Sequence, residues 1–328
     1  MNDSQTDHAL ALDFGGTNLA AAIVRLADGE LIAYRKTATP AAAGAEASLQ
    51  RMVKIAEESL RESMLPMARL RGAGISFGGM VAPDGSRVVR SMHVKGWEDM
   101  PLPQRISDHF HLPAAMGNDG NVAALGEWRY GSGGQPDPFI YIQISTGIGG
   151  GVILNRKIFC GQGMGAEIGH LKVQFDPEHS ESSEPCACGS RGCIEAVAAG
   201  WALEREAKKL AAQADEGTLF QRVMRETNEC SAKTLVQAVQ LGDTGAKAVL
   251  DHAFTSFALT LSDLMVLLDP QEIVLGGSVA VNAWDLLEPI LTEKLPGFLP
   301  ANWGQRTAIR SSRLKGTETL LGAAQLVA

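Results

Sequence analysis

Three cysteines lie within eight residues of one another in the stretch CACGSRGC. Cys186, Cys188 and Cys193 are interleaved with glycines, which let a backbone bend tightly, and thiolates that converge in this way are typical ligands of zinc. A closed zinc site needs a fourth ligand, which His170 or His179 could supply. The alternative is that the cysteines are inert and that His179 is a solvated loop residue. The clustering favours zinc, and the spacing leaves the choice between the histidines open.

Two glycine-rich turns each join a pair of strand-like segments, LALDFGGTNLAAAIVRL (10–26) and FIYIQISTGIGGGVILN (139–155). Both patterns predict a β-hairpin. A turn without bulky side chains lets backbone N–H groups approach an anion closely. A third glycine pair, Gly276 and Gly277, ends the strand-like QEIVLGG. One such turn most often only reverses the chain, but two similar hairpins and a third loop favour phosphate binding.

Asp119 stands where a strand is expected to end and a helix to begin, between LPAAMG and GNVAALGEWRY. Aspartate at such a junction is commonly a helix N-cap, and the spacing alone favours that role. The carboxyl end of a strand is also where α/β enzymes place catalytic groups, so Asp119 is a candidate catalytic residue. Glu167 and Glu195 flank the cysteine cluster, and either one alone would be an ordinary surface acid.

The elements that must position these residues indicate an α/β protein. The 328 residues exceed the usual size of one domain, so two domains are expected. Strands are predicted at ELIAYRKTAT and RGAGISF, with a helix at ASLQRMVKIAEESLRESM between them. Long helices are expected between about 194 and 268, and TETLLGAAQLVA predicts an amphipathic helix. No P-loop motif occurs, and GQGMGA lacks the βαβ surroundings of a dinucleotide site, so we interpret it as a chance match.

The charge and the N-terminal sequence exclude several kinds of partner. A net charge of −8 argues against nucleic acid as the main partner. No apolar run approaches the roughly 20 residues of a membrane span, and MNDSQTDH has no export signal. A cytoplasmic location is therefore expected, where reduced thiols disfavour a disulfide framework.

Six segments together resemble the ROK family (repressors, open reading frames and sugar kinases): LDFGGTN, GNDGNVAALGE, STGIGGG, GAEIGH, CACGSRGCIE and VLGGSV. The resemblance runs from Leu10 to the final helix. It implies the actin-like, hexokinase-type ATPase fold, with two α/β domains hinged around a cleft where ATP and a sugar meet. The expected domains are residues 1–119 together with 309–328, and residues 120–308, which contain the zinc knuckle.

The resemblance also implies an activity, the phosphorylation of a hexose by ATP with Mg²⁺. Asp119 would be the base that accepts the proton of the attacking sugar hydroxyl, and Asp13 would help to hold Mg²⁺. His170, and not His179, would complete a structural zinc site with the three cysteines. The other implied residues are Gly15, Gly16, Thr17, Asn18, Thr146, Gly147, Gly276 and Gly277 for the nucleotide, and Gly79, Asn118, Asp119, Glu167, His170 and Glu195 for the sugar.

The identity of the sugar depends on segments where this chain departs from its relatives. Many relatives carry an Asn-Leu pair before the Gly-Trp motif, where this chain has His93 and Val94, and Met80 lies in a loop that varies among related kinases. Glucose, phosphorylated at its 6-hydroxyl, is the first candidate, and N-acetylglucosamine, N-acetylmannosamine and fructose are alternatives. A homodimer or homotetramer is expected.

Two non-catalytic alternatives are disfavoured. A sugar-responsive transcriptional regulator of the family would carry an N-terminal winged helix, for which a first hairpin at residue 10 leaves no room. A sugar-binding or zinc-structured interaction module would not need the intact Asp119 and phosphate turns.

Overall fold

The computed structural model describes residues 6–91, 93–163, 165–173, 183–213, 217–301, 303 and 306–328. The described chain divides into two compact units. The first takes its residues from Met1–Tyr141, Gly151–Ala166 and Arg313–Ala328, and the second takes them from Ile142–Gly150 and Glu167–Ser312. The domain boundary after residue 119 stays a prediction, and α3, which follows that residue, belongs to the first unit.

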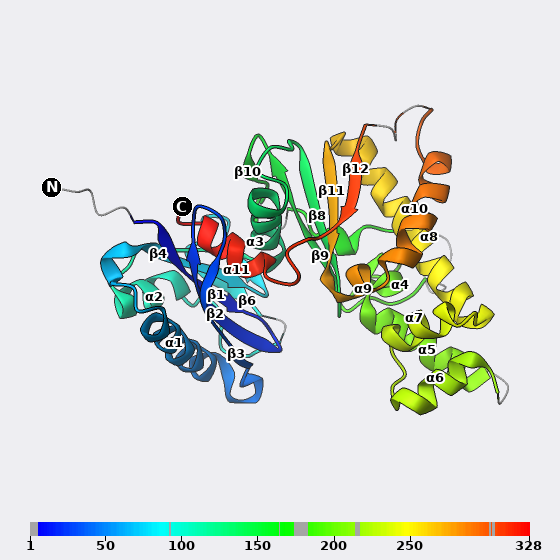
Figure 1. Ribbon diagram of the computed structural model, residues 1–328, viewed down its shortest axis with the longest axis horizontal. Helices are drawn as coiled ribbons and strands as arrows, with labels where there is room; N and C mark the ends of the chain where they lie inside the picture. Colours follow the sequence, from blue (N-terminus) through cyan, green and yellow to red (C-terminus); the bar gives the residue numbers. More distant parts are fainter. Residues whose placement is uncertain are drawn as a thin grey trace. The chain divides into compact units, whose positions relative to one another are not determined.

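A five-stranded sheet in the order β3-β2-β1-β4-β7 forms the centre of the first unit (Figure 1). The strands are β1 (His8–Phe14), β2 (Asn18–Arg25), β3 (Leu31–Ala38), β4 (Leu70–Phe77) and β7 (Ala114–Asn118). β1 and β2 form the first predicted hairpin, and β4 and β7 continue the sheet in parallel. Phe14 pairs with Phe77, and Phe77 pairs with Asn118. The three strands therefore end at one edge, and the residues that follow them begin there.

Helices cover both faces of this sheet. α1 (Gly44–Ser63) and α2 (Leu102–Phe110) share one apolar core with the larger side chains of β1, such as Leu10 and Leu12. α3 (Asp119–Gly126) and α11 (Glu318–Gln325) share the other core, to which β1 and β2 contribute mainly alanines.

Small residues let α11, the red helix beside the blue strands in Figure 1, approach the sheet closely. A Cβ atom on Gly74 would lie 1.7 Å from the backbone oxygen of Ala323, and one on Gly322 would lie 1.7 Å from the oxygen of Val122. Only glycine fits at both contacts. The helix that comes latest in the described sequence is thus part of the first sheet's core.

The second sheet has the order β10-β9-β8-β11-β12. Its strands are β8 (Phe139–Ile144), β9 (Ile148–Leu154), β10 (Lys157–Ile158), β11 (Glu272–Gly276) and β12 (Ala308–Ser311). β8 and β9 are neighbours joined by only three residues, which requires an antiparallel hairpin. The second predicted hairpin is therefore present.

Most of the second unit's chain is helical, as the sequence predicts between about 194 and 268. Its helices are α4 (Glu195–Ala198), α5 (Gly200–Gln213), α6 (Leu219–Thr227), α7 (Ala232–Gln240), α8 (Thr244–Leu268), α9 (Gly277–Asn282) and α10 (Trp284–Phe298). α8 begins where the Asp243 side chain accepts a hydrogen bond from the Ala246 backbone N–H (2.8 Å). Across the described ranges, no helix is both long and apolar enough to cross a membrane.

Short elements complete the described chain: β5 (Met80–Val81), β6 (Val88–Arg90), a π-helical turn (Glu127–Gly131) and 3-10 turns at Ala41–Ala43, Met67–Arg69 and Ile168–His170.

Candidate active site and metal centre

Asp119 is the first residue of α3, directly after β7. The helix N-cap is Asn118, whose Oδ1 accepts hydrogen bonds from the backbone N–H groups of Gly120 (3.0 Å) and Asn121 (3.3 Å). The N-cap interpretation of Asp119 is therefore wrong. Its Oδ1 accepts from the Gly120 N–H (2.9 Å) and from Asn118 Nδ2 (3.1 Å), which orients the carboxylate at the positive end of the helix.

The turn after β4 lies beside this carboxylate. Asn118 Nδ2 donates to the backbone oxygen of Gly79 (3.2 Å). The Gly78 N–H donates to the oxygen of Phe14 (2.9 Å), and a Cβ atom on Gly78 would lie 3.6 Å from Asp119 Oδ2. The structure thus brings Gly79, Asn118 and Asp119 together at the aligned strand ends.

The first glycine turn is held at the same edge by backbone contacts. The Gly15 N–H donates to the Asn18 oxygen (3.0 Å), and Thr39 Oγ1 donates to the Gly15 oxygen (2.7 Å). A Cβ atom on Gly15 would lie 2.8 Å from the Asn18 oxygen, and one on Gly16 would lie 2.7 Å from the ring of His93. Both glycines are therefore required by close approach.

A small pocket is lined in part by this turn. Its walls include the backbone of the turn, Val94, and the rings of Phe77 and Trp97, which meet edge to face with centroids 5.1 Å apart. The segment that departs from the family pattern, His93 and Val94, thus borders the first glycine turn.

Asp13 is held by two hydroxyl groups that sequence analysis did not identify. Ser76 Oγ donates to Oδ1 (2.8 Å) and Thr319 Oγ1 donates to Oδ2 (3.1 Å). Burial raises the pKa of Asp13, and these hydrogen bonds and the charge of Lys36 oppose that effect. Ser76 is the register partner of Asp13 in the parallel pair β1–β4, so a strand alignment could have found it. No sequence signal points to Thr319, which lies 306 residues away.

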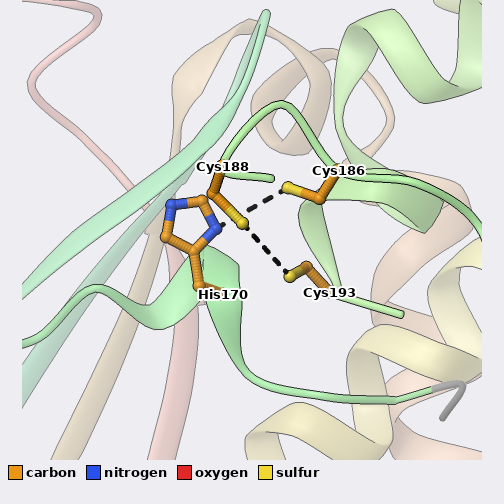
Figure 2. A group of neighbouring side chains, drawn as sticks. All are labelled: His170, Cys186, Cys188 and Cys193. Carbon is orange, nitrogen blue, oxygen red and sulfur yellow. Dashed lines mark hydrogen bonds between the residues drawn. The ribbon is translucent and has the colours of Figure 1, made fainter. Parts of the chain in front are cut away.

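The three cysteines and one histidine meet in the second unit (Figure 2). The candidate ligand atoms of His170, Cys186, Cys188 and Cys193 all lie within 4.8 Å of one another. Cys186 Sγ is 3.8 Å from His170 Nδ1, and Cys188 Sγ is 3.8 Å from Cys193 Sγ. A tetrahedron with Zn–S bonds of about 2.3 Å places its sulfurs about 3.8 Å apart. The group therefore has the size and the donors of a structural zinc site. His179 lies outside the described residues.

Glycines and backbone hydrogen bonds shape this knuckle. The Gly189 N–H donates to the Cys186 oxygen (3.0 Å), and the Cys186 N–H donates to the Ser190 oxygen (2.8 Å). Gly189 (φ 89°) and Gly192 (φ 71°) adopt the left-handed conformation that glycine tolerates best. The sequence CACGSRGC thus folds its own cysteines toward one point.

The thiols of the cluster differ in acidity. Burial raises the pKa of Cys186 to about 12. Burial also tends to raise the pKa of Cys188. The hydrogen bond from the Ser190 N–H and the contacts with the neighbouring thiols outweigh this effect, so the pKa of Cys188 is lowered. Binding of a divalent cation would require the protons to leave, because the thiolate is the ligand form.

Glu195 connects the cysteine cluster to the second glycine turn. Its Oε2 accepts a hydrogen bond from the Ile148 N–H (3.0 Å), and a Cβ atom on Gly147 would lie 2.8 Å from the same oxygen. Its Oε1 lies 3.9 Å from Cys186 Sγ. The carboxylate is therefore not simply a charge at the start of α4. The sequence places Glu195 beside the cluster, but no local pattern points to its hydrogen bond with Ile148, which lies 47 residues away.

The other predicted residues of the second unit occupy turns. The oxygen of Thr146 accepts from the Trp201 N–H at the start of α5 (3.2 Å). Glu167 precedes the 3-10 turn that carries His170. Gly276 ends β11, and Gly277 begins α9 with φ 81°. A Cβ atom on Gly277 would lie 2.5 Å from the Ile144 oxygen, so this strand–helix junction lies next to the end of β8.

The predicted residues thus form two groups, one in each unit. The first unit holds Asp13, Gly15, Gly16, Thr17, Asn18, Gly79, Asn118 and Asp119. The second holds Thr146, Gly147, Glu167, His170, Cys186, Cys188, Cys193, Glu195, Gly276 and Gly277.

Comparison with known proteins reveals relatives along almost the whole chain. The profile of the ROK family matches residues 9–328. N-acetylmannosamine kinase of Yersinia pseudotuberculosis is 31% identical over 317 residues, 96% of each chain. Glucokinase of Halalkalibacterium halodurans is 29% identical over 86% of this chain and 83% of its own. The crystal structure of an ROK family glucokinase from Streptomyces griseus, in complex with glucose and AMPPNP, matches with a TM-score of 0.80 and 28% identity over 97% of this chain and 98% of that one.

Proposed function

The chain belongs to the ROK family, and we propose that it is a sugar kinase that transfers the γ-phosphoryl group of ATP to a hexose hydroxyl. The predicted actin-like ATPase fold is confirmed by the match to solved ROK kinases. The observation that carries the proposal is the position of Asp119. Its carboxylate is oriented at the end of β7, next to the turns after β1 and β4, and a different residue caps the helix.

Asp119 acts as the general base in this proposal. It accepts the proton of a sugar hydroxyl while that oxygen attacks the γ-phosphorus, and the bond from phosphorus to the β-phosphate oxygen breaks. The hydrogen bonds from Gly120 and Asn118 fix the carboxylate so that little reorganisation is needed. Asn118, Gly79, Glu167, His170 and Glu195 are proposed to bind the sugar.

The glycine turns are proposed to bind the nucleotide. Backbone N–H groups of Gly15–Asn18 and of Thr146–Gly147 would face phosphate oxygens, and Gly276 and Gly277 would border the adenosine. The Asp13 carboxylate accepts hydrogen bonds from two hydroxyl groups. Mg²⁺ is commonly bound by one or two carboxylates and keeps several waters, so we propose that Asp13 holds Mg²⁺ through water. Mg²⁺ supplies charge neutralisation of the phosphates when bound.

Zinc fits the His170 and cysteine group on the 3.8 Å spacing alone. With four protein ligands the site is closed, so its contribution is structural. Its residues hold the knuckle from which Glu195 reaches Ile148. The proposal includes a cytoplasmic location, where the thiols stay reduced, and a homodimer or homotetramer.

An assay of ADP release tests the proposed activity. Purified protein with ATP and Mg²⁺ is offered glucose, N-acetylmannosamine, N-acetylglucosamine and fructose, since the relatives are named for different sugars and His93 and Val94 border the first turn. We expect sugar-stimulated ADP release, fastest with glucose. The Asp119→Asn variant serves as the blank. If no sugar stimulates ADP release, the proposal of an ATP-dependent sugar kinase is wrong.

Glu195→Ala is expected to raise the KM for sugar by about tenfold or more while lowering kcat much less, because the hydroxyls that it binds do not react. The alanine also leaves the Ile148 N–H without its acceptor, so the KM for ATP should rise too. Glu195→Gln keeps an oxygen acceptor for Ile148 and should leave the KM for ATP near that of the parent.

Steady-state kinetics in both substrates decide this prediction. Glu204→Ala is the matched control, because Glu204 lies on α5 and pairs with the exposed Lys208. An unaltered sugar KM in Glu195→Ala would mean that Glu195 does not bind the sugar and that its role is confined to the turn at Ile148.

A further inference from the structure

One lysine of the second unit is directed at the cysteine cluster. Lys172 Nζ donates to Ser190 Oγ (2.6 Å), to the backbone oxygen of Arg191 (2.7 Å) and to Cys193 Sγ (3.1 Å). An ammonium group has three N–H donors, and these are three acceptors within the knuckle. Lys172 is an exposed residue, but its ammonium group is hydrogen-bonded.

The backbone fixes this lysine opposite its sulfur. Lys172 and Cys193 form an isolated antiparallel bridge. On either side of it the Val173 N–H donates to the Gly192 oxygen (2.9 Å), and the Ile194 N–H donates to the Leu171 oxygen (2.9 Å). This small ladder places the Lys172 backbone opposite Cys193, and the three contacts of Nζ hold the ammonium at the sulfur.

We propose that Lys172 is a positioning residue that stabilises the loaded metal centre by donating to the Cys193 thiolate. This inference rests on the proposed zinc site. Three thiolates, one neutral imidazole and a divalent cation leave the centre with a net charge of about −1. The Lys172 ammonium offsets that charge, and it does so beside Cys193, which is fully buried. A cation next to a buried anion is less screened than a surface pair.

A second cation of the knuckle, Arg191, has a contact of a different kind. Arg191 Nη1 donates to the backbone oxygen of Ser183 (2.8 Å). This hydrogen bond ties Arg191 to the backbone that leads into the knuckle. Lys172, in contrast, contacts a candidate ligand atom, Cys193 Sγ. Partners of this kind typically contribute about 10–100-fold to metal affinity.

Zinc release measures this contribution directly. The zinc-loaded parent, Lys172→Met, Lys172→Arg and Lys233→Met are mixed with an excess of a chromogenic chelator, and the release rate is recorded at low and high salt. Lys172→Met should release zinc about tenfold faster than the parent, or more. Lys172→Arg keeps the charge and should release zinc at a rate closer to that of the parent. The difference in release rate between Lys172→Met and the parent should be smaller at high salt. Lys233→Met is the control, because Lys233 lies on α7, pairs with Glu229 and is not part of the cluster, so the release rate should stay that of the parent.

The possible results distinguish the role of Lys172 from the proposed zinc site and from the proposed kinase activity. A parent that contains no zinc refutes the metal site itself. A parent that holds zinc, with Lys172→Met releasing it at the parent rate, overturns the role of Lys172 and leaves the kinase proposal intact. Release by Lys172→Arg as fast as by Lys172→Met also overturns it, because the charge would then be irrelevant. If Lys172→Met is not recovered folded, Lys172→Gln removes the same charge and carries the same test.

Discussion

Replacing Asp119 with asparagine is expected to lower kcat by about 10²–10⁴-fold, because the amide cannot accept the proton of the attacking hydroxyl. The fold should be unaffected. The asparagine oxygen can still accept from the Gly120 N–H, and Asn118 remains the N-cap of α3. The KM values for sugar and ATP should therefore stay within a few-fold of the parent.

The measurement is steady-state turnover together with binding of sugar and nucleotide. Asp108→Asn provides the control, because Asp108 is a carboxylate on α2 that pairs with Gln104 and lies outside the site. Turnover of Asp119→Asn within tenfold of the parent would show that Asp119 is not the base. Loss of sugar binding together with turnover would show a role in binding instead.

Cys188→Ser is expected to abolish zinc binding and to lower Tm by about 10 °C or more. A structural zinc contributes its binding free energy to folding, and about 1 kcal/mol shifts Tm by about 2–4 °C in a domain of 150–250 residues. Glu195 should lose its fixed position at the same time, because it follows Cys193 by two residues and its Oε1 lies 3.9 Å from Cys186 Sγ. Sugar-dependent turnover should then fall with the metal content.

Elemental analysis and thermal denaturation check this prediction. The purified parent should contain one zinc per chain, and a chelator should lower its Tm toward that of Cys188→Ser. Cys160→Ser and Cys230→Ser are matched controls, because neither cysteine belongs to the cluster. A zinc-free parent, with Cys188→Ser as stable and active as the parent, would exclude the site.

Local patterns were sufficient to predict the elements that carry the site. The two hairpins, the strand–helix junction at Asn118 and the helices after residue 194 all follow from hydrophobic periodicity and glycine turns. The same patterns could not decide between Asn118 and Asp119 as the cap, because both residue types accept hydrogen bonds from free helix N–H groups equally well. Only the folded backbone shows that the cap is Asn118.

Contacts between distant segments could not be predicted from local patterns. Thr319 reaches Asp13, and Glu195 reaches Ile148, only because of how helices and strands pack. The choice of His170 as the fourth ligand came from the family resemblance, since spacing did not separate it from His179. The contact between Lys172 and Cys193 could not be predicted either, because the two residues are brought together by a backbone bridge between separate segments.

The discontinuous make-up of the first unit has a consequence for protein synthesis. A ribosome must translate residues 167–312, which belong to the second unit, before it makes the segment that contains α11. Until then the alanine-lined face of β1 and β2 lacks α11, one of the two helices that share its core, and Asp13 lacks Thr319. The nascent chain therefore presents an apolar sheet face through much of elongation, which makes it a candidate for chaperone binding. Stalled translation products that end before α11 should be recognised by proteases, whatever the state of their second unit.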